Sequence, residues 1–428
     1  MEQVRTGDDR VSDAVKEKVV RNARHPGIAL VLQGGGARAA YQVGVLKAVS
    51  EILGHPEENP FPIITGTSAG AINAAVLAVN ADNFARGVES LVRVWENFTP
   101  DQVYRTDFRG VASNSIKWLS SFLFGSVTKN HRVSLFDNSP LLELIERHVQ
   151  LGEIARHIDS GVLRAVAVTA SGYATGQHCA FFQAAPDVTG WRRSQRVGIR
   201  VSKLRPEHLM ASAAIPFACP ATKINREYFG DGSIRQMAPM SPALHLGATR
   251  VFVVGTAKLV KDMPERVRSE LYPSLAQIAG HAMESIFLDS LAVDIELLQR
   301  VNATLTVVDH DRLKQSGMNL HHIDVCVACP NEPLETQAFR HVGDLPWTTR
   351  YLMRSIGAMR RGGATLASYM LFDYRYCKAL IKMGYDDTMA RHDEIAIFFD
   401  ATACPLPPVI PYHAFDPGKT LTMDAQDV

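Results

Sequence analysis

The stretch Pro62–Val79, which reads PIITGTSAGAINAAVLAV, constrains the fold of this chain more than any other part of the sequence. An apolar run typical of a β-strand ends in Gly66-Thr67-Ser68-Ala69-Gly70, and a run of small residues typical of a helix follows at once. A strand that turns so sharply into a helix crowds its own backbone, and glycines at Gly66 and Gly70 relieve the crowding. The pattern predicts a nucleophile elbow with Ser68 at its tip, beside the N-terminus of a helix.

Apolar runs alternate with helical patterns along most of the chain. We expect strands at 28–33, 61–64, 163–170, 179–183, 250–256, 304–309 and 323–328, and a long helix at about 273–301. Strands that alternate with helices are typical of a mostly parallel sheet that is covered by helices on both faces.

A second glycine-rich turn follows the first expected strand and reads Gly34-Gly35-Gly36-Ala37-Arg38. Glycines at a strand end let backbone N–H groups approach an anion, and the start of the following helix adds its dipole. Two kinds of site fit: an oxyanion hole for acyl transfer, or a phosphate cradle for a nucleotide. The nucleotide fingerprint fits badly, because Ala39 stands where its third glycine belongs and no G-K-[ST] motif follows.

A serine hydroxyl needs a base to become a good nucleophile. The histidines that follow Ser68 lie mostly in helical or polar contexts, so a Ser-His-Asp triad stays open but unsupported. Asp231 lies between Gly230 and Gly232, and flanking glycines allow its carboxylate to approach a serine at a neighbouring strand end. An ordinary Asp-Gly turn without chemistry is the alternative interpretation.

Taken together and in this order, the glycine loop 34–38, the elbow 66–70, the block Ala211–Pro216 (ASAAIP) and the turn Asp231-Gly232 resemble the patatin-like phospholipases. The resemblance covers about residues 27–330. It implies a three-layer α/β/α sandwich and hydrolysis of lipid acyl esters by a serine–aspartate dyad, without a metal or another cofactor. Two positions depart from the family pattern. Ala39 stands where the family usually has glycine, and Ser233 stands where it usually has glycine or alanine.

Carried over by position, the resemblance implies these roles. Ser68 is the nucleophile and Asp231 the base, Gly66 and Gly70 shape the elbow, and Gly230 and Gly232 shape the base turn. Gly34, Gly35, Gly36, Ala37, Arg38 and Ala69 form the oxyanion hole, in which Arg38 either adds positive potential or orients the loop. An acyltransferase that uses the same acyl-enzyme, and a lipid-binding protein without catalysis, remain as alternatives.

The resemblance and the sequence patterns on either side of it together divide the chain. Residues 27–330 form the expected catalytic domain, preceded by a polar N-terminal arm (1–26). A helical C-terminal extension (331–400) and a proline-rich tail (401–428) follow.

The remaining features bear on partners and location. The net charge of +1 gives no overall field that would favour nucleic acid or an anionic membrane. The aromatic stretch 116–124 (IKWLSSFLF) fits a lid, a patch for peripheral membrane contact or a buried helix. The six cysteines are too scattered for a disulfide scaffold, so a cytoplasmic location is expected. The Cys326-Val-Ala-Cys329 pair suits a strand better than a zinc site, and the oligomeric state stays open.

Overall fold

The computed structural model describes residues 27–105, 134, 136–216, 218–259, 274–287, 289–308, 313, 315, 320–341, 343, 350 and 364–400. The expected arm 1–26, the tail 401–428 and the aromatic stretch 116–124 lie outside the described residues.

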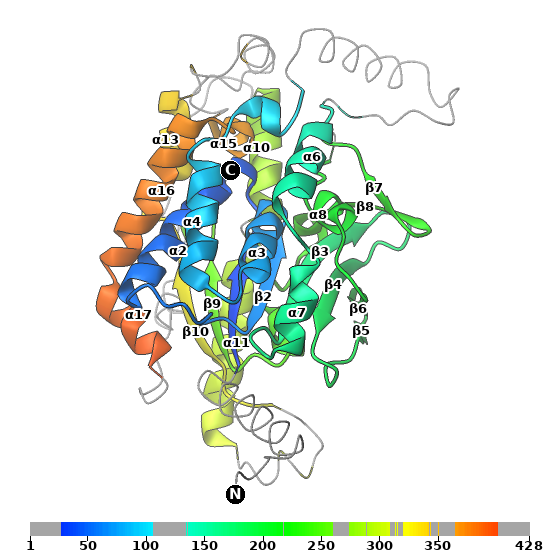
Figure 1. Ribbon diagram of the computed structural model, residues 1–428, viewed down its shortest axis with the longest axis vertical. Coiled ribbons are helices and arrows are strands. Elements are labelled where there is room, and N and C mark those ends of the chain that lie inside the picture. Colours follow the sequence, from blue (N-terminus) through cyan, green and yellow to red (C-terminus); the bar gives the residue numbers. More distant parts are fainter. Residues whose placement is uncertain are drawn as a thin grey trace, which may run out of the picture.

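One twisted sheet forms the centre of the molecule (Figure 1). Its strands are β1 (Ile28–Leu32), β2 (Ile63–Thr67), β3 (Ala165–Gly172), β4 (His178–Ala184), β5 (Trp191–Arg193), β6 (Arg196–Arg200), β7 (Thr222–Ile224), β8 (Glu227–Asp231), β9 (Arg250–Val254) and β10 (Asp324–Ala328). The main path runs β10-β9-β1-β2-β3-β4-β6-β5, and the hairpin β7–β8 joins it at β3. All pairs from β10 to β3 are parallel, whereas β3 pairs with both β4 and β8 in antiparallel fashion.

Helices cover both faces of this sheet. They are η1 (Gly36–Ala39), α2 (Ala40–Ile52), α3 (Ala69–Val79), α4 (Phe84–Trp95), η2 (Pro100–Gln102), α6 (Ser139–His148), α7 (Glu153–Asp159), α8 (Pro206–Ser212), η3 (Gly232–Arg235), α9 (Ser241–His245), α10 (Leu275–Phe287), α11 (Asp289–Val307), α13 (Leu334–His341), α15 (Ala364–Met370), α16 (Tyr374–Met389) and α17 (His392–Phe399).

The alternation of side chains along β1 explains the layers. Leu30 and Leu32 point into the larger core, which α2, α3 and α4 complete in front of the sheet in Figure 1. Ala29 and Val31 point into a second core with side chains of α9 and α11. Because successive residues of a strand point to opposite faces of the sheet, a strand that is apolar throughout must be covered on both faces. The expected three-layer α/β/α sandwich is therefore confirmed.

One expected strand is wrong. Residues 304–307 continue α11 as a helix, and the single helix expected at 273–301 is two helices, α10 and α11. The β-branched residues there favour a strand locally, but the preceding helical turns supply partners for them. The hydroxyl of Thr304 donates to the carbonyl of Arg300 (2.9 Å), and Leu305 is buried. Tertiary packing overrides the local preference in such cases.

The C-terminal helices α16 and α17 pack directly on the sandwich. Gly44 of α2 and Gly384 of α16 lie at the crossing of the two helices, where a Cβ on either would overlap a carbonyl oxygen of the other helix. In α17, Phe399 contacts the ring of Phe61 with ring centres 5.5 Å apart. Residues near the C-terminus thus share the larger core with the first strands of the chain.

Candidate active site

The predicted elbow forms at the junction of β2 and α3. Ser68 has φ +54° and ψ −129°, a backbone conformation that is strained for a residue with a side chain. A Cβ on Gly66 would lie 2.6 Å from the Cα of Ala71, and one on Gly70 would overlap the carbonyl oxygens of β1 and the residue after it. Only glycine fits at these two positions, so the local sequence dictates the sharp turn that displays Ser68.

Asp231 reaches Ser68 because two strands share one edge of β3. The strand β2 pairs along this edge up to Thr67, which faces Thr169, and then turns away at Ser68. The strand β8 occupies the edge from the next position, where Asp231 faces Ala170. The other edge of β3 is filled by β4. The register of the sheet therefore places the last residue of β8 beside the residue at which β2 ends.

The carboxyl group of Asp231 is completely buried. Its Oδ1 accepts a hydrogen bond from the N–H of Ser233 (2.9 Å), and its own N–H donates to the carbonyl of Ala214 (2.9 Å). Burial raises the pKa of Asp231 to about 6, although the nearby Ser68 hydroxyl and the Ser233 amide lower it. No hydrogen bond of ordinary geometry joins the side chains of Ser68 and Asp231, and Oδ2 has no partner. A dehydrated carboxyl with one free oxygen thus lies next to the elbow serine.

Three further hydrogen bonds fix the elbow in the sheet. The N–H of Ser68 donates to the hydroxyl of Ser212 at the end of α8 (2.8 Å). The hydroxyls of Thr67 and Thr169 lie 2.7 Å apart, and the side-chain amide of Gln236 donates to Thr67 (2.8 Å). Ser212 belongs to the sequence block 211–216, but nothing in the sequence assigned it this contact.

The glycine loop follows β1 and continues into η1 and α2. Gly36 has φ +54° and lines the same pocket as Ser68 and Ala69. Arg38 is buried and its contacts lie in the C-terminal segment: its Nε donates to the hydroxyl of Ser368 (2.7 Å), and its guanidinium lies over the ring of Tyr369 (4.2 Å). Of the two roles expected for Arg38, these contacts favour orientation of the loop.

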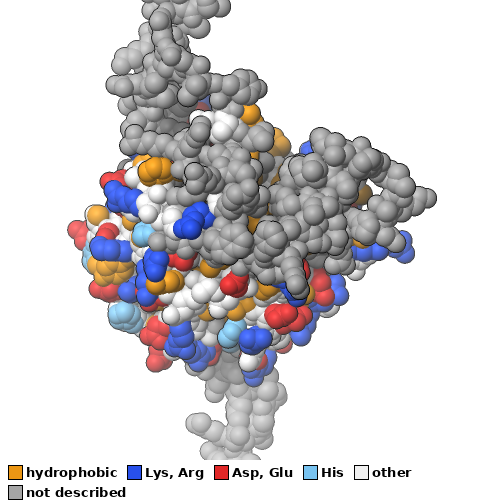
Figure 2. Space-filling model, turned by 90° about the horizontal axis from the view of Figure 1, so that it is seen from above, with side chains coloured by type: hydrophobic (Ala, Val, Ile, Leu, Met, Phe, Trp, Pro, Cys, Tyr) orange, Lys and Arg blue, Asp and Glu red, His pale blue; other side chains and the backbone are white. Residues whose placement is uncertain are grey.

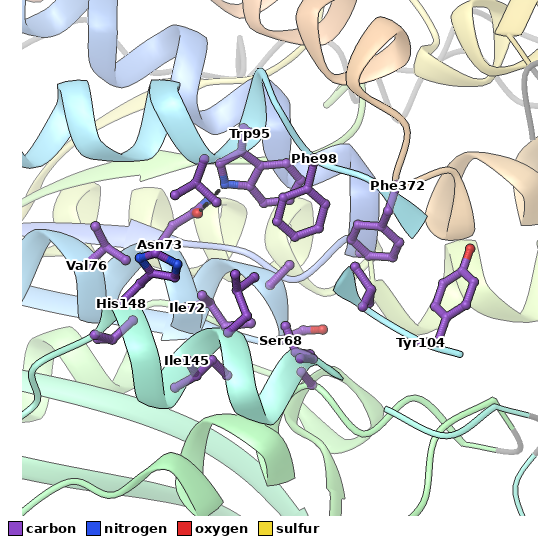
Figure 3. Close-up of a pocket in the computed structure, with 18 of the residues that line it drawn as sticks. Ser68, Ile72, Asn73, Val76, Trp95, Phe98, Tyr104, Ile145, His148 and Phe372 are labelled. Atoms are coloured by element: carbon purple, nitrogen blue, oxygen red, sulfur yellow. Dashed lines mark hydrogen bonds between the residues drawn. The ribbon is translucent and has the colours of Figure 1, made fainter. Parts of the chain in front are cut away.

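An apolar pocket extends from Ser68 between α3, α4 and α6 (Figure 3). Ile72 and Val76 line it one and two helical turns beyond Ser68, Phe372 and Tyr104 lie on the other side, and His148 lies at the end near Val76. The amide of Asn73 also faces the pocket but is fully engaged, because it accepts from the indole N–H of Trp95 (2.9 Å) and donates to Gln42 (3.0 Å). The walls therefore favour an apolar chain.

The described part of the chain contains no Ser-His-Asp triad at Ser68 and no metal site. There, no histidine is hydrogen bonded to Ser68, and no three histidine, cysteine or acidic side chains gather as metal ligands would. None of the described helices has the length and apolar character needed to cross a membrane. On the face seen from above, acidic and basic side chains are interspersed (Figure 2).

Comparisons with known proteins place this site in a family. The model of the patatin-like phospholipase domain matches residues 30–244. A 50-residue segment is 48% identical to the cUMP-AMP-activated phospholipase of Escherichia coli, covering 12% of this chain and 16% of that protein. A 55-residue segment is 51% identical to lysophospholipase nte1 of Aspergillus terreus, covering 13% of this chain and 3% of that protein.

The crystal structure of VipD from Legionella pneumophila aligns over 86% of this chain and 67% of that chain, with 14% identity and a TM-score of 0.31. The curated relatives are thus matched over a small part of their lengths, whereas the family model spans β1, the elbow, β8 and α9. The chain belongs to the patatin-like phospholipase family.

Proposed function

We propose that this protein is a serine hydrolase that cleaves carboxylic esters of lipids through an acyl-enzyme on Ser68. The observation that carries the proposal is the position of Ser68 on a strained elbow, beside the buried and half-unpaired carboxyl of Asp231, at one side of an apolar pocket. Membership of the patatin-like family supports the same class of reaction.

In the proposed mechanism, the hydroxyl oxygen of Ser68 attacks the ester carbonyl while Asp231 accepts the hydroxyl proton. Backbone N–H groups of the 34–36 loop and of Ala69 donate to the developing oxyanion, and each such donor is typically worth about 3 kcal/mol. The proton passes to the departing alcohol or lysolipid. Water then attacks the acyl-enzyme, gives one proton to Asp231 and releases the fatty acid, and Ser68 recovers its proton.

The environment of Asp231 supports its role as base. An aspartate in water has a pKa near 4 and is a poor base, but burial raises the pKa of Asp231 to about 6. A base is most effective when its pKa lies close to the working pH, because it is then both ionised and able to hold a proton. The carboxylate is therefore mostly ionised at neutral pH and more basic than one in solvent.

The pocket supports an acyl chain as the group that binds beside Ser68. Its lining is apolar, and the amide that faces it has its hydrogen-bonding capacity already used. An aliphatic chain buried there gains about 0.8 kcal/mol per methylene, whereas a polar group would lose its water without replacement. An acyltransferase shares this first half-reaction and differs only in the acceptor.

Fluorophosphonate labelling tests the proposal. We expect the probe to modify Ser68, with labelling abolished in Ser68→Ala and strongly reduced in Asp231→Asn. Ser90→Ala is the matched control, because Ser90 is a partly exposed serine on α4 whose hydroxyl donates to its own helix at Arg86. Folded wild-type protein that stays unlabelled, with and without detergent or vesicles, would contradict the proposal. Product analysis with and without added alcohol then separates hydrolysis from acyl transfer.

A further inference from the structure

We propose that Ser368 is a positioning residue for the proposed reaction, because it holds the oxyanion loop in place through Arg38. The inference rests on the proposed function and assigns part of the catalytic geometry to α15, more than 300 positions away from the loop in sequence.

Arg38 is a buried cation with its contacts on one side. Its side chain is fully buried, its Nε donates to Ser368, and its Nη2 lies 3.5 Å from a carboxylate oxygen of Glu335 on α13. The flat guanidinium also covers the ring of Tyr369. A buried charge is costly unless its partners are fixed. The side chain that begins in the oxyanion loop is therefore anchored in α13 and α15.

The backbone of the loop is enclosed in the same way. The carbonyl of Gly34 accepts from the hydroxyl of Thr256 (2.7 Å), which closes one side of the loop. On the other side, the left-handed conformation of Gly36 brings it so close to α15 that a Cβ would overlap the carbonyl oxygen of Tyr369. The position of the loop amides relative to Ser68 thus depends on where α15 lies.

The hydroxyl of Ser368 is oriented for this role. It donates to the carbonyl of Thr365 in its own helix (2.5 Å), which leaves its lone pairs free to accept from Arg38. The end of α15 is fixed as well, because the hydroxyl of Tyr104 donates to the carbonyl of Met370 (2.7 Å). Met370 also lines the pocket. One short helix therefore supports both the loop and a wall of the pocket.

Loss of the Arg38–Ser368 hydrogen bond should affect the transition state more than substrate binding. The oxyanion exists only after attack, so misplaced loop amides lower kcat. The apolar pocket, which dominates binding, keeps its shape. A displacement of about 1 Å in such a site can cost about a hundredfold in rate. Removal of one anchoring bond should shift the loop less, and we expect kcat to fall about tenfold with KM within about twofold.

The test compares Ser368→Ala with Thr388→Val, measured on p-nitrophenyl butyrate in the full-length protein. Both residues are buried in C-terminal helices, and both hydroxyls donate to a carbonyl in their own helix, at Thr365 and Gly384. Only Ser368 also accepts from Arg38. We expect a lower thermal midpoint for Ser368→Ala, because a buried N–H of Arg38 loses its acceptor, so both variants are assayed well below that midpoint. The tenfold loss of kcat is expected only in Ser368→Ala, with recovery to within about threefold in Ser368→Thr, which keeps the hydroxyl.

The outcomes are distinct. A kcat of Ser368→Ala equal to that of Thr388→Val overturns the inference and leaves the proposed function intact. Wild-type protein without ester hydrolysis overturns the proposed function and the inference with it. If Ser368→Ala does not fold, Glu335→Gln decides, because Glu335 is partly exposed and glutamine keeps its size while removing its charge from Arg38. A kcat reduced at unchanged KM in that variant supports the inference, and wild-type kinetics overturn it.

Discussion

Ser68 and Asp231 meet at one edge of β3, but they are held there by different kinds of contact. The shape of the elbow depends on two glycines within two residues of Ser68, Gly66 and Gly70, at which a Cβ would overlap neighbouring backbone. Asp231 is fixed by partners distant in sequence, through the pairing of β8 with β3. The nucleophile thus depends on local backbone geometry, whereas the base depends on sheet register. Substitutions should therefore harm the two in different ways.

The largest effect on activity is expected from Asp231→Asn, which removes the base but keeps its shape. Loss of a general base typically costs about 10²–10⁴-fold in rate. We expect a loss near the upper end of that range in kcat/KM for p-nitrophenyl butyrate. A variant that retains more than a tenth of wild-type activity would show that another group accepts the proton.

The same variant should be more stable than the wild-type protein at alkaline pH. The pKa of Asp231 is about 6 in the folded protein and near 4 when unfolded, so the folded state binds more protons between these values. Stability therefore falls as pH rises from about 4 to about 6, by up to about 3 kcal/mol. Asparagine cannot ionise, so Asp231→Asn escapes this loss.

Denaturant titrations of both proteins at pH 4 and pH 8 measure the difference, which should be present only at pH 8. Wild-type activity should in turn decline below about pH 6 as Asp231 takes up a proton. A stability difference that is the same at both pH values would contradict the burial of an ionised carboxylate.

Gly70→Ala should harm the nucleophile through the elbow alone. Its Cβ would overlap carbonyl oxygens at the end of β1, so the turn must move and carry Ser68 with it. We expect about a hundredfold loss in kcat/KM and in the rate of fluorophosphonate labelling. Gly152→Ala is the control, because a Cβ there would meet only the flexible end of Lys203 at 3.8 Å. Equal labelling rates for the two variants would contradict the idea that the position of Ser68 depends on the backbone of the elbow.

Ser212→Ala tests the long-range contact made by the N–H of Ser68 itself. It leaves the N–H of Ser68 without its acceptor in a buried site, which typically costs about 1–3 kcal/mol. We expect about a tenfold drop in kcat/KM and a matching loss in the free energy of unfolding. Activity and stability both at wild-type level would mean that the elbow does not depend on its contact with Ser212.

The smallest effect on short esters is expected from Val76→Phe, which leaves both catalytic groups in place. Val76 lies eight residues after Ser68, about 12 Å along α3. An extended chain advances about 1.25 Å per carbon, so a chain of roughly ten carbons would reach this point. A larger side chain there should lower kcat/KM about tenfold for dodecanoyl esters and at most twofold for butyryl esters.

Val293→Phe is the control for this variant, since Val293 is exposed on α11 and does not line the pocket. A chain-length profile that is unchanged in Val76→Phe would place the acyl chain elsewhere.

The sequence predicted the fold class and the local turns, because both follow from short-range patterns. Apolar strands buried on both faces predict the sandwich, and the glycines at Gly66 and Gly70 predict the elbow. The strand expected at 304–309 is wrong for the opposite reason, since Leu305 is buried by packing of α11 while the β-branched residues around it are exposed. The catalytic roles of Ser68 and Asp231 remain predictions that the geometry supports.

Only the tertiary structure decided which distant parts meet at the site. The register that sets Asp231 beside Ser68, the acceptor at Ser212 and the anchoring of Arg38 by Ser368 involve residues separated by more than 100 positions. These residues form no motif, because a hydrogen-bond acceptor can be supplied from anywhere in the chain that folding brings into reach. The sequence by itself therefore determined the shape of the turns that carry the predicted site residues, and the packing of β8, α8 and α15 determined how these turns are held together.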